Sequence, residues 1–349
     1  MPRRLWIAAV VVLALAAGTG GYLRWRQHGE TSFAWAAAHA PPDAQRLSWT
    51  DWSAIREHEH ADLSSRSSAA EVRRFLGRAY DDDLSSTSAL VTSAAVLQDR
   101  YGFSPASADW ELFAQSYQGA VVMLHMPSTG DLGDVADNLR DLGYREPSDP
   151  TGVWLGGEDL LARISPELTG ELQYVALDSA DRLVLTSDSA SFLSVATAAV
   201  RGHGRASGLE GVVDDAGQPL SSAVYAGDYA CGALAMAHAG ASDQVQAQQL
   251  LAAAGEVNPY SAFAMSDEPD GSVRVSFEFD SAGTARTNAE TRATLARGPA
   301  PGQGGSFGDR FRVTSATAHG ALVVLQLAPR PGAAVISDLS TGPVLFASC

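Results

Sequence analysis

Hydrophobic and polar residues alternate in short runs that predict β-hairpins, and longer stretches with a helical period separate these runs. The clearest hairpin spans residues 110–126, where two apolar runs flank a turn at Tyr117-Gln118-Gly119. The same pattern predicts further hairpins over residues 172–187, 261–279 and 310–327. Hairpins with one apolar face are typical of an antiparallel sheet that is covered by helices on that face.

Apolar residues recur at helical spacing between the hairpins. Leu132, Val135, Leu139 and Leu142 form one such stripe, and Gly143 follows it as expected at a helix C-terminus. Similar stripes predict helices near residues 72–79, 90–101, 192–200, 242–254 and 281–297.

The order strand, helix, hairpin, helix, hairpin occurs twice. Trp49 in the first half matches Tyr225 in the second, and Phe113 matches Phe263, but the second pair is closer together in the sequence than the first. A changing separation indicates insertions within a shared plan rather than a solenoid of fixed period. The alternative is a chance likeness between two stretches of the same class.

We therefore predict an α+β fold of two related domains, each an antiparallel sheet of hairpins packed with helices. The first domain spans residues 44–205 and the second residues 219–349. Residues 206–218 are polar and rich in glycine, with little periodicity, and are predicted to be a linker.

An uncharged apolar stretch, residues 5–23, lies near the N-terminus. A helix of that length spans close to the roughly 30 Å of a bilayer core. The sequence thus predicts a transmembrane helix within residues 1–26, with Arg3 and Arg4 favouring a cytoplasmic N-terminus. Residues 27–43 are rich in alanine, end in a Pro-Pro pair and are predicted to be a stalk.

A cleaved signal peptide is the competing interpretation of this stretch. Its densest apolar part is short, and Ala14-Leu15-Ala16 offers a cleavage site of small residues. Under either interpretation the C-terminal body lies outside the cytoplasm, anchored in the cell membrane or secreted.

The charge of the chain narrows the range of partners. All 24 positive residues are Arg, and four of them flank the apolar stretch within residues 1–26, so the body carries 20 Arg against 40 acidic residues. Such a body would be repelled by nucleic acid and by anionic lipid headgroups. We expect no nucleic-acid partner, and contact with the membrane only through the N-terminal helix.

The chain has two cysteines, Cys231 and Cys349, and each lies in an apolar context. In an oxidising compartment these residues are predicted to form a disulfide. Two free buried thiols, or a bridge between two chains through Cys349, are the alternatives.

The sequence Gly304-Gly-Ser306-Phe-Gly308 fits the G-x-S-x-G pattern of serine hydrolases, with His238 or His319 as a possible base. A nucleophile elbow requires a strand before the serine and a helix after it. Here a Gly/Pro-rich segment precedes Ser306 and a predicted strand follows, so we expect a loop.

Two polar segments raise the question of metal binding. Residues 57–60 (Glu-His-Glu-His) are adjacent in sequence, and neither a helix nor a strand makes such side chains converge. Residues 81–83 (Asp-Asp-Asp) lack the spaced ligands of a calcium loop. We expect both segments to be solvated turns, and we expect no metal or cofactor.

Four large aromatic residues, Trp49, Trp52, Tyr225 and Tyr229, are candidates for a ligand groove. Aromatic side chains of this size more often fill hydrophobic cores.

Residues 47–52 (Leu-Ser-Trp-Thr-Asp-Trp), residues 227–236 and the ending 342–349 resemble an uncharacterised family of actinobacterial membrane-associated extracytoplasmic proteins. The resemblance covers nearly the whole chain after the predicted stalk, and it implies compartment and lineage without an activity. We therefore expect a cell-envelope protein that is not an enzyme and binds a ligand or partner of unknown identity, such as an apolar ligand between sheet and helices. A serine hydrolase using Ser306 is the alternative.

Overall fold

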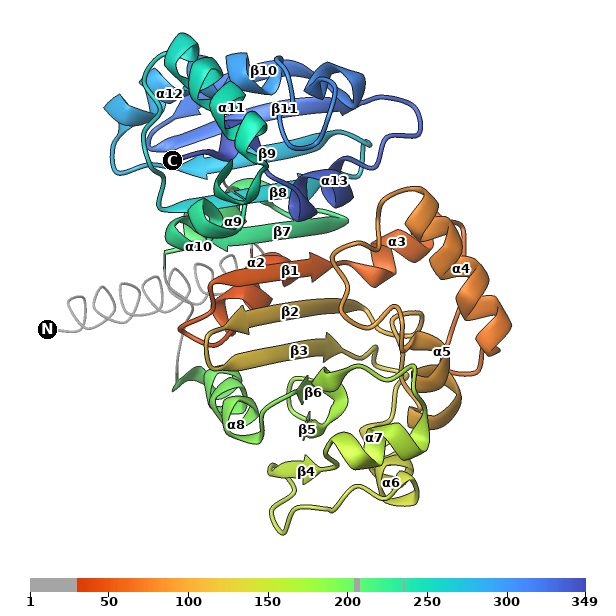
Figure 1. The fold of residues 1–349 in the computed structure, drawn as a ribbon. Coiled ribbons are helices and arrows are strands. Elements are labelled where there is room, and N and C mark those ends of the chain that lie inside the picture. Colours follow the sequence, from red (N-terminus) through yellow and green to blue (C-terminus); the bar gives the residue numbers. More distant parts are fainter. Residues whose placement is uncertain (1–29, 204–207, 235) are drawn as a thin grey trace, which may run out of the picture.

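The computed structural model describes residues 30–203, 208–234 and 236–349. All of its strands belong to one continuous antiparallel sheet in the order β10-β11-β9-β8-β7-β1-β2-β3-β6-β5-β4 (Figure 1). Helices pack on both faces of this sheet, so the predicted α+β class is confirmed.

The strands of the first half are β1 (Arg46–Thr50), β2 (Trp110–Ser116), β3 (Gly119–His125), β4 (Val153–Leu155), β5 (Tyr174–Asp178) and β6 (Leu183–Ser187). Those of the second half are β7 (Ser221–Ala226), β8 (Ala262–Asp267), β9 (Val273–Glu278), β10 (Phe311–His319) and β11 (Leu322–Pro329). The four predicted hairpins correspond to the pairs β2–β3, β5–β6, β8–β9 and β10–β11.

The helices of the first half are α2 (Ser32–Ala38), α3 (Trp52–His58), α4 (Ala69–Asp81), α5 (Ala94–Val96), α6 (Leu132–Leu142), α7 (Glu158–Ile164) and α8 (Ala190–Ala198). Those that follow are α9 (Glu210–Ala216), α10 (Gly227–Ala233), α11 (Ala241–Ala254), α12 (Ala282–Ala296) and α13 (Val335–Thr341). Of the six predicted helices, the one at residues 90–101 differs most: it forms as the short α5 followed by a wider π-type turn over Leu97–Tyr101.

The two halves join where β1 pairs with β7. The pairing is antiparallel and runs from Arg46↔Tyr225 to Thr50↔Ser221. Residues 44–205 and 219–349 therefore share one sheet. The sequence pattern did not reveal this junction, because β1 and β7 each also pair with the next strand of their own half.

The strand order is the same in both halves when it is followed outward from the junction: β1-β2-β3-β6-β5 in the first half and β7-β8-β9-β11-β10 in the second. The hairpins at residues 110–126 and 261–279 thus occupy equivalent positions. The duplication itself stays a prediction, which this equivalence favours.

One of the sequence matches requires a correction. Phe113 and Phe263 both face the helices that cover their own half, as equivalent positions should. Trp49 and Tyr225 instead face opposite sides of the sheet, because across the junction Trp49 lies opposite Ser222, and side chains on a strand alternate. Trp49 pairs with Leu112, the residue before Phe113, and Ala226 pairs with Ala262, the residue before Phe263, so Ala226 is the structural counterpart of Trp49.

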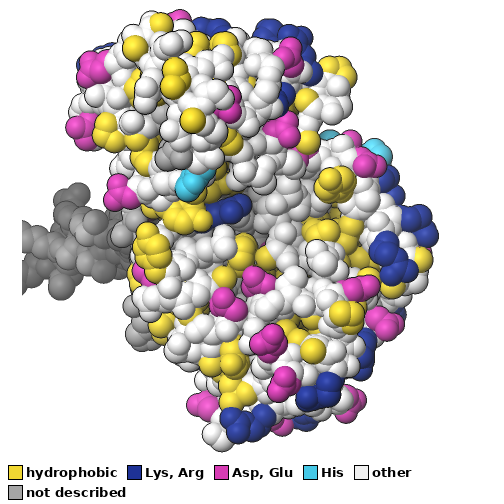
Figure 2. All heavy atoms as spheres, in the orientation of Figure 1, with side chains coloured by type: hydrophobic (Ala, Val, Ile, Leu, Met, Phe, Trp, Pro, Cys, Tyr) yellow, Lys and Arg dark blue, Asp and Glu magenta, His cyan; other side chains and the backbone are white. Residues whose placement is uncertain are grey.

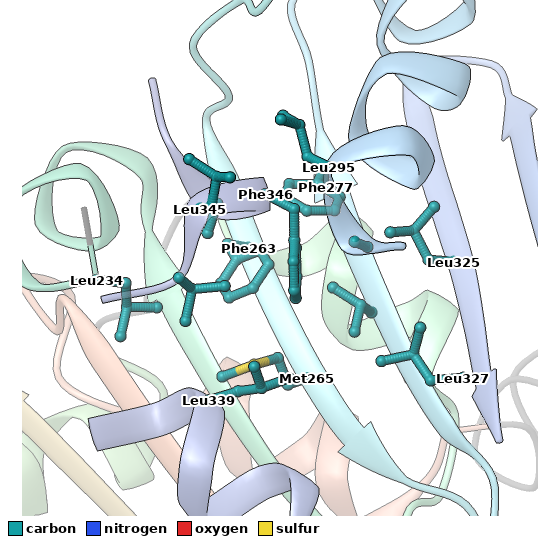
Figure 3. Packing of buried hydrophobic residues seen from close by; sticks show 14 of the residues in the cluster. Leu234, Phe263, Met265, Phe277, Leu295, Leu325, Leu327, Leu339, Leu345 and Phe346 are labelled. Carbon is teal, nitrogen blue, oxygen red and sulfur yellow. The ribbon is translucent and has the colours of Figure 1, made fainter. Parts of the chain in front are cut away.

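The helices divide between the two faces of the sheet. On one face α3–α7 cover the first half and α10–α13 the second, and each group closes its own hydrophobic core. On the other face α2, α8 and α9 pack on the central strands and form a third core that draws residues from both halves. In Figure 3, Phe346 from the C-terminal segment lies beside Phe263 and Phe277 of the second-half core, and Leu339 of α13 lies beside Met265.

The segments predicted to be a stalk and a linker each contain a helix that packs on the sheet. Within the predicted stalk, α2 buries Phe33, Ala36 and Ala37, a helical stripe that the high alanine content obscured. Within the predicted linker, α9 buries Val212 and Val213 among glycine and polar neighbours. Both helices join the third core, so α2 and α9 are part of the packed body.

The predicted transmembrane helix at residues 5–23 lies outside the described residues. Within the part of the chain that the structure describes, no helix has the length and apolar character needed to span a membrane.

The predicted disulfide between Cys231 and Cys349 is confirmed, with 5.8 Å between the Cα atoms. Cys231 lies on α10. A second attachment of the C-terminus comes from the fully buried Arg292, which donates hydrogen bonds to the carbonyl oxygens of Phe346 and Ser348. Burial lowers the pKa of Arg292 to about 10. The last residues of the chain are therefore held covalently and by a buried guanidinium.

Replacing both cysteines (Cys231→Ser with Cys349→Ser) is expected to lower the free energy of unfolding by about 2–5 kcal/mol, because the bond closes a loop of 118 residues. Urea denaturation of the full chain would measure the loss. A reductant should lower the free energy of unfolding of the wild type and leave that of the double variant unchanged. A loss below about 1 kcal/mol, half of the least that such bonds typically contribute, would contradict a stabilising bond.

Candidate functional site

Two cavities open at the same end of the sheet and on opposite faces. The first, the aromatic pocket, has a volume of about 520 Å³ and lies beside α2. The second, the junction pocket, has a volume of about 420 Å³ and lies beside α13. β1 ends at this edge of the sheet with Thr50. Thr50 pairs with Glu111 near the start of β2 and with Ser221 at the start of β7, so these strand ends lie side by side.

The aromatic pocket is built on a cluster of rings. Trp110 and His125 face each other across the β2–β3 hairpin, and their rings stack at 5.2 Å between centroids, 12° from parallel. Trp35 of α2 packs against Trp110 at 6.0 Å, and the buried Trp49 supports Trp110 from the core at 5.4 Å. The pocket is lined by Glu30, Thr31, Ser32, Trp35, Trp110, His125, Ala180, Asp181 and Arg182.

Hydrogen bonds fix the orientation of His125. Its Nδ1 lies 3.0 Å from Oδ2 of Asp109, an arrangement that suits donation from Nδ1–H to the carboxylate. Its Nε2 then accepts from Nη2 of Arg182, at 3.4 Å. The imidazole is therefore held between an acid and a guanidinium, with one ring face against Trp110.

Arg182 is held in an uncommon backbone conformation, with φ +52 in the β5–β6 turn. Oδ1 of Asp178 accepts hydrogen bonds from the backbone N–H groups of Ala180 and Asp181 and so shapes the turn. The N–H of Met126 donates to the carbonyl oxygen of Arg182 at 2.9 Å. Non-glycine residues at positive φ persist only where the surroundings fix them, and they concentrate at functional sites.

The junction pocket is acidic and includes residues from both halves. Asp83 of the first half accepts hydrogen bonds from the backbone N–H groups of Ile336 and Ser337, at the start of α13 in the second half. Beside it, Oδ2 of Asp267 accepts from the hydroxyl of Ser221 at 2.7 Å. Burial, together with the nearby Asp83 and Glu268 carboxylates, raises the pKa of Asp267 to about 8.

The four aromatic candidates from the sequence do not come together. Trp49, Trp52 and Tyr225 are each at most 1% exposed and lie in three different cores. Tyr229 is partly buried and stacks on Tyr225 at 6.3 Å. We therefore do not retain a groove lined by these four. Buried side chains of the three cores lie between the sheet and the helices, and the expected apolar ligand stays a prediction.

Ser306 begins a short 3-10 helix as its N-cap. Its hydroxyl donates to the carbonyl oxygen of Gly298 and accepts from the N–H of Gly308. Nε2 of His238 lies 2.7 Å from the carbonyl oxygen of Gly232, and His319 is exposed at the end of β10. Neither histidine is a hydrogen-bond partner of Ser306 within the described residues.

The two polar segments considered for metal binding meet in space. His58 and Glu59 from the first segment and Asp82 from the second have potential ligand atoms within 4.8 Å of one another. Sequence reasoning treated each segment separately and missed their contact.

The aromatic pocket was also missed, although part of it could have been found. A turn centred on Tyr117 and Gln118 pairs Ser116 with Gly119, and the same register pairs Trp110 with His125. Trp35 and Arg182 gave no comparable signal, since only the tertiary packing of α2 and the β5–β6 turn brings them to this hairpin.

No protein-family model, curated protein or solved structure matches this chain. The actinobacterial family resemblance stays a prediction.

The raised pKa of Asp267 predicts a pH effect on stability. Below pH 4 its carboxyl is protonated in both states. Between pH 4 and 8 the unfolded chain ionises it while the folded protein keeps the proton, so stability falls as pH rises. Between pH 5 and pH 8, the free energy of unfolding of the wild type should fall by at least about 1 kcal/mol more than that of Asp267→Asn. This difference corresponds to about one pKa unit.

Denaturant titrations at a series of pH values would measure this difference. Asp214→Asn, at an exposed position, is the control and should follow the wild-type curve. Parallel curves for wild type and Asp267→Asn would contradict the predicted shift.

Proposed function

We propose that this protein is a non-catalytic binding protein of the cell envelope, and that the aromatic pocket binds one or two sugar rings of a glycan. The observation that carries the proposal is the cluster of Trp35, Trp110 and His125 along a cavity of about 520 Å³, in which Trp110 and His125 stack and Trp35 packs at a tilt against Trp110.

The compartment follows from the disulfide between Cys231 and Cys349, which indicates an oxidising location outside the cytoplasm. We propose further that residues 5–23 are kept as a membrane anchor. Glu30 at the pocket rim follows Leu23 by only seven positions, a reach of at most about 25 Å. The pocket would then lie close to the external surface of the membrane, where lipid meets water. Protease added to intact cells should digest the body, and a protected body would contradict this topology.

The chemistry of the lining supports a polyhydroxylated ligand. Indole and imidazole rings offer flat apolar surfaces for the C–H face of a sugar ring. Around them, Arg182 and Ser32 offer donors, and Glu30 and Asp181 offer acceptors. A sugar has both kinds of group on its rim. The volume lies within the roughly 300–1,000 Å³ typical of small-molecule sites.

The arrangement of Ser306 supports binding over hydrolysis. An activated serine needs its hydroxyl free to donate to a base, whereas Ser306 donates to the backbone of Gly298. A fluorophosphonate probe tests this part of the proposal. Labelling of Ser306 in the folded protein would overturn it and favour the hydrolase.

The binding proposal is tested with full-length protein in detergent, first on a glycan array and then by calorimetric titration of the glycans retained. Trp35→Ala should weaken the binding of a retained glycan at least tenfold, because it removes an aromatic wall, a change of about 1.4 kcal/mol. His125→Ala should also weaken it, since it removes the ring stacked on Trp110.

Tyr117→Ala is the matched control, since Tyr117 is 88% exposed and lies on the same hairpin at its turn, away from the Trp110–His125 pair. Its affinity should equal that of wild type. Absence of any retained glycan, or equal losses in Trp35→Ala and Tyr117→Ala, would contradict the proposal.

A further inference from the structure

We propose that the C-terminal ends of α3 and α4 form a binding site for one divalent transition-metal ion of the Zn²⁺ class, held by His58, Glu59 and Asp82. An imidazole nitrogen of His58 and one carboxylate oxygen from each acid lie within 4.8 Å of one another. This site is separate from the aromatic pocket and does not depend on the glycan proposal.

The fold brings the three ligands together by joining two helix ends. His58 is the last residue of α3 and Glu59 is its C-cap, while Asp82 is the C-cap of α4. Arg78 in the last turn of α4 donates from Nε to Oε2 of Glu59 at 2.9 Å and from Nη2 to the Glu59 carbonyl oxygen at 3.4 Å. Both helix ends carry partial negative charge, which favours a cation between them.

The side chain of Glu59 points independently to a missing partner. It is 6% exposed, and Oε2 is engaged by Arg78. The other oxygen, Oε1, is buried and has no hydrogen-bond partner within the described residues. Leaving a buried carboxylate oxygen unpaired is unfavourable, and coordination to a cation would remove that cost.

The other two ligands are available to a metal. His58 and Asp82 are exposed, and their side chains make no hydrogen bond or ion pair with the described part of the chain. Donor atoms around a tetrahedral Zn²⁺ lie about 3.3 Å apart, given metal–ligand bonds of about 2.0 Å. Side-chain rotations of His58 and Asp82 can supply the remaining approach.

The donor set indicates which metal fits. One imidazole with two carboxylates suits Zn²⁺, whereas Mg²⁺ and Ca²⁺ prefer oxygen ligands alone. His58 and Asp82 also line the junction pocket, where the carboxylates of Asp81, Asp83 and Glu268 lie with one Arg. This excess of negative charge raises the local concentration of cations.

A metal here would clamp the first half at its contact with the second. Asp83 follows Asp82 directly and caps α13, which lies beside α3 and α4 in Figure 1. An ion joining the ends of α3 and α4 would therefore fix the position of Asp83 and stabilise the contact between the halves.

The test uses the full chain in detergent, stripped with EDTA and then titrated calorimetrically with Zn²⁺, Mg²⁺ or Ca²⁺. We expect one Zn²⁺ per chain, with at least tenfold weaker binding in His58→Ala and in Asp82→Asn. Visible absorption of bound Co²⁺ should report a site with a nitrogen ligand in wild type, and the bands should be absent from His58→Ala.

Neighbouring residues of the same types provide the controls. His60→Asn, chosen because Asn tolerates the φ of +50 at this position, and Asp81→Asn should bind Zn²⁺ as wild type does. Circular dichroism of the metal-free variants should match wild type, and Asp82→Asn decides the matter if His58→Ala does not fold. The proposal would be overturned if Zn²⁺ did not bind stoichiometrically, or if Ca²⁺ or Mg²⁺ bound and Zn²⁺ did not. It would also be overturned if the control variants lost as much Zn²⁺ affinity as the ligand variants.

Discussion

The pairing of β1 with β7 is the contact on which the rest of the structure depends. Five residue pairs join the two halves into one sheet, and the segment that enters β7 is bound to β1 as well. The indole Nε1 of Trp49 donates to the carbonyl oxygen of Pro219, and the N–H of Asp51 donates to the carbonyl oxygen of Leu220. A continuous sheet lets helices from one half pack on strands of the other.

Both cavities exist because of this junction. On one face, α2 rests against Trp49 through Phe33, and Thr31 donates to the carbonyl oxygen of Gly217 just before β7, which places Trp35 over Trp110. On the other face, Asp83 crosses from the first half to cap α13. On the face that Figure 2 shows, charged side chains of both signs are scattered and the hydrophobic ones form small groups. The concave sites are therefore better candidates for ligand recognition than this open surface.

The fold class, the four hairpins and the disulfide could be predicted from the sequence because each leaves a local or countable signal. Alternating residues mark the strands, and two cysteines in an oxidising compartment allow one intramolecular pair. The shared sheet gave no such signal, since the apolar runs of β1 and β7 suit an edge strand and a central strand equally. The aromatic pocket depends on the contact of Trp35 with Trp110, and the proposed metal site on the proximity of Glu59 to Asp82, and in both cases the residues lie on separate elements. Only the tertiary arrangement makes them neighbours.

The central claim is that the β1–β7 junction makes the two halves one cooperative unit. Native-state hydrogen exchange, followed by mass spectrometry on the full chain, tests it most directly. The structure predicts that amides of β1 and β7 exchange among the slowest, with the free energy of global unfolding, and that β2 and β8 open together with them. The opposite result would be that residues 219–349 exchange as a separate unit at a lower free energy while β1–β6 stay protected. That result would contradict the claim that the two halves form one cooperative unit.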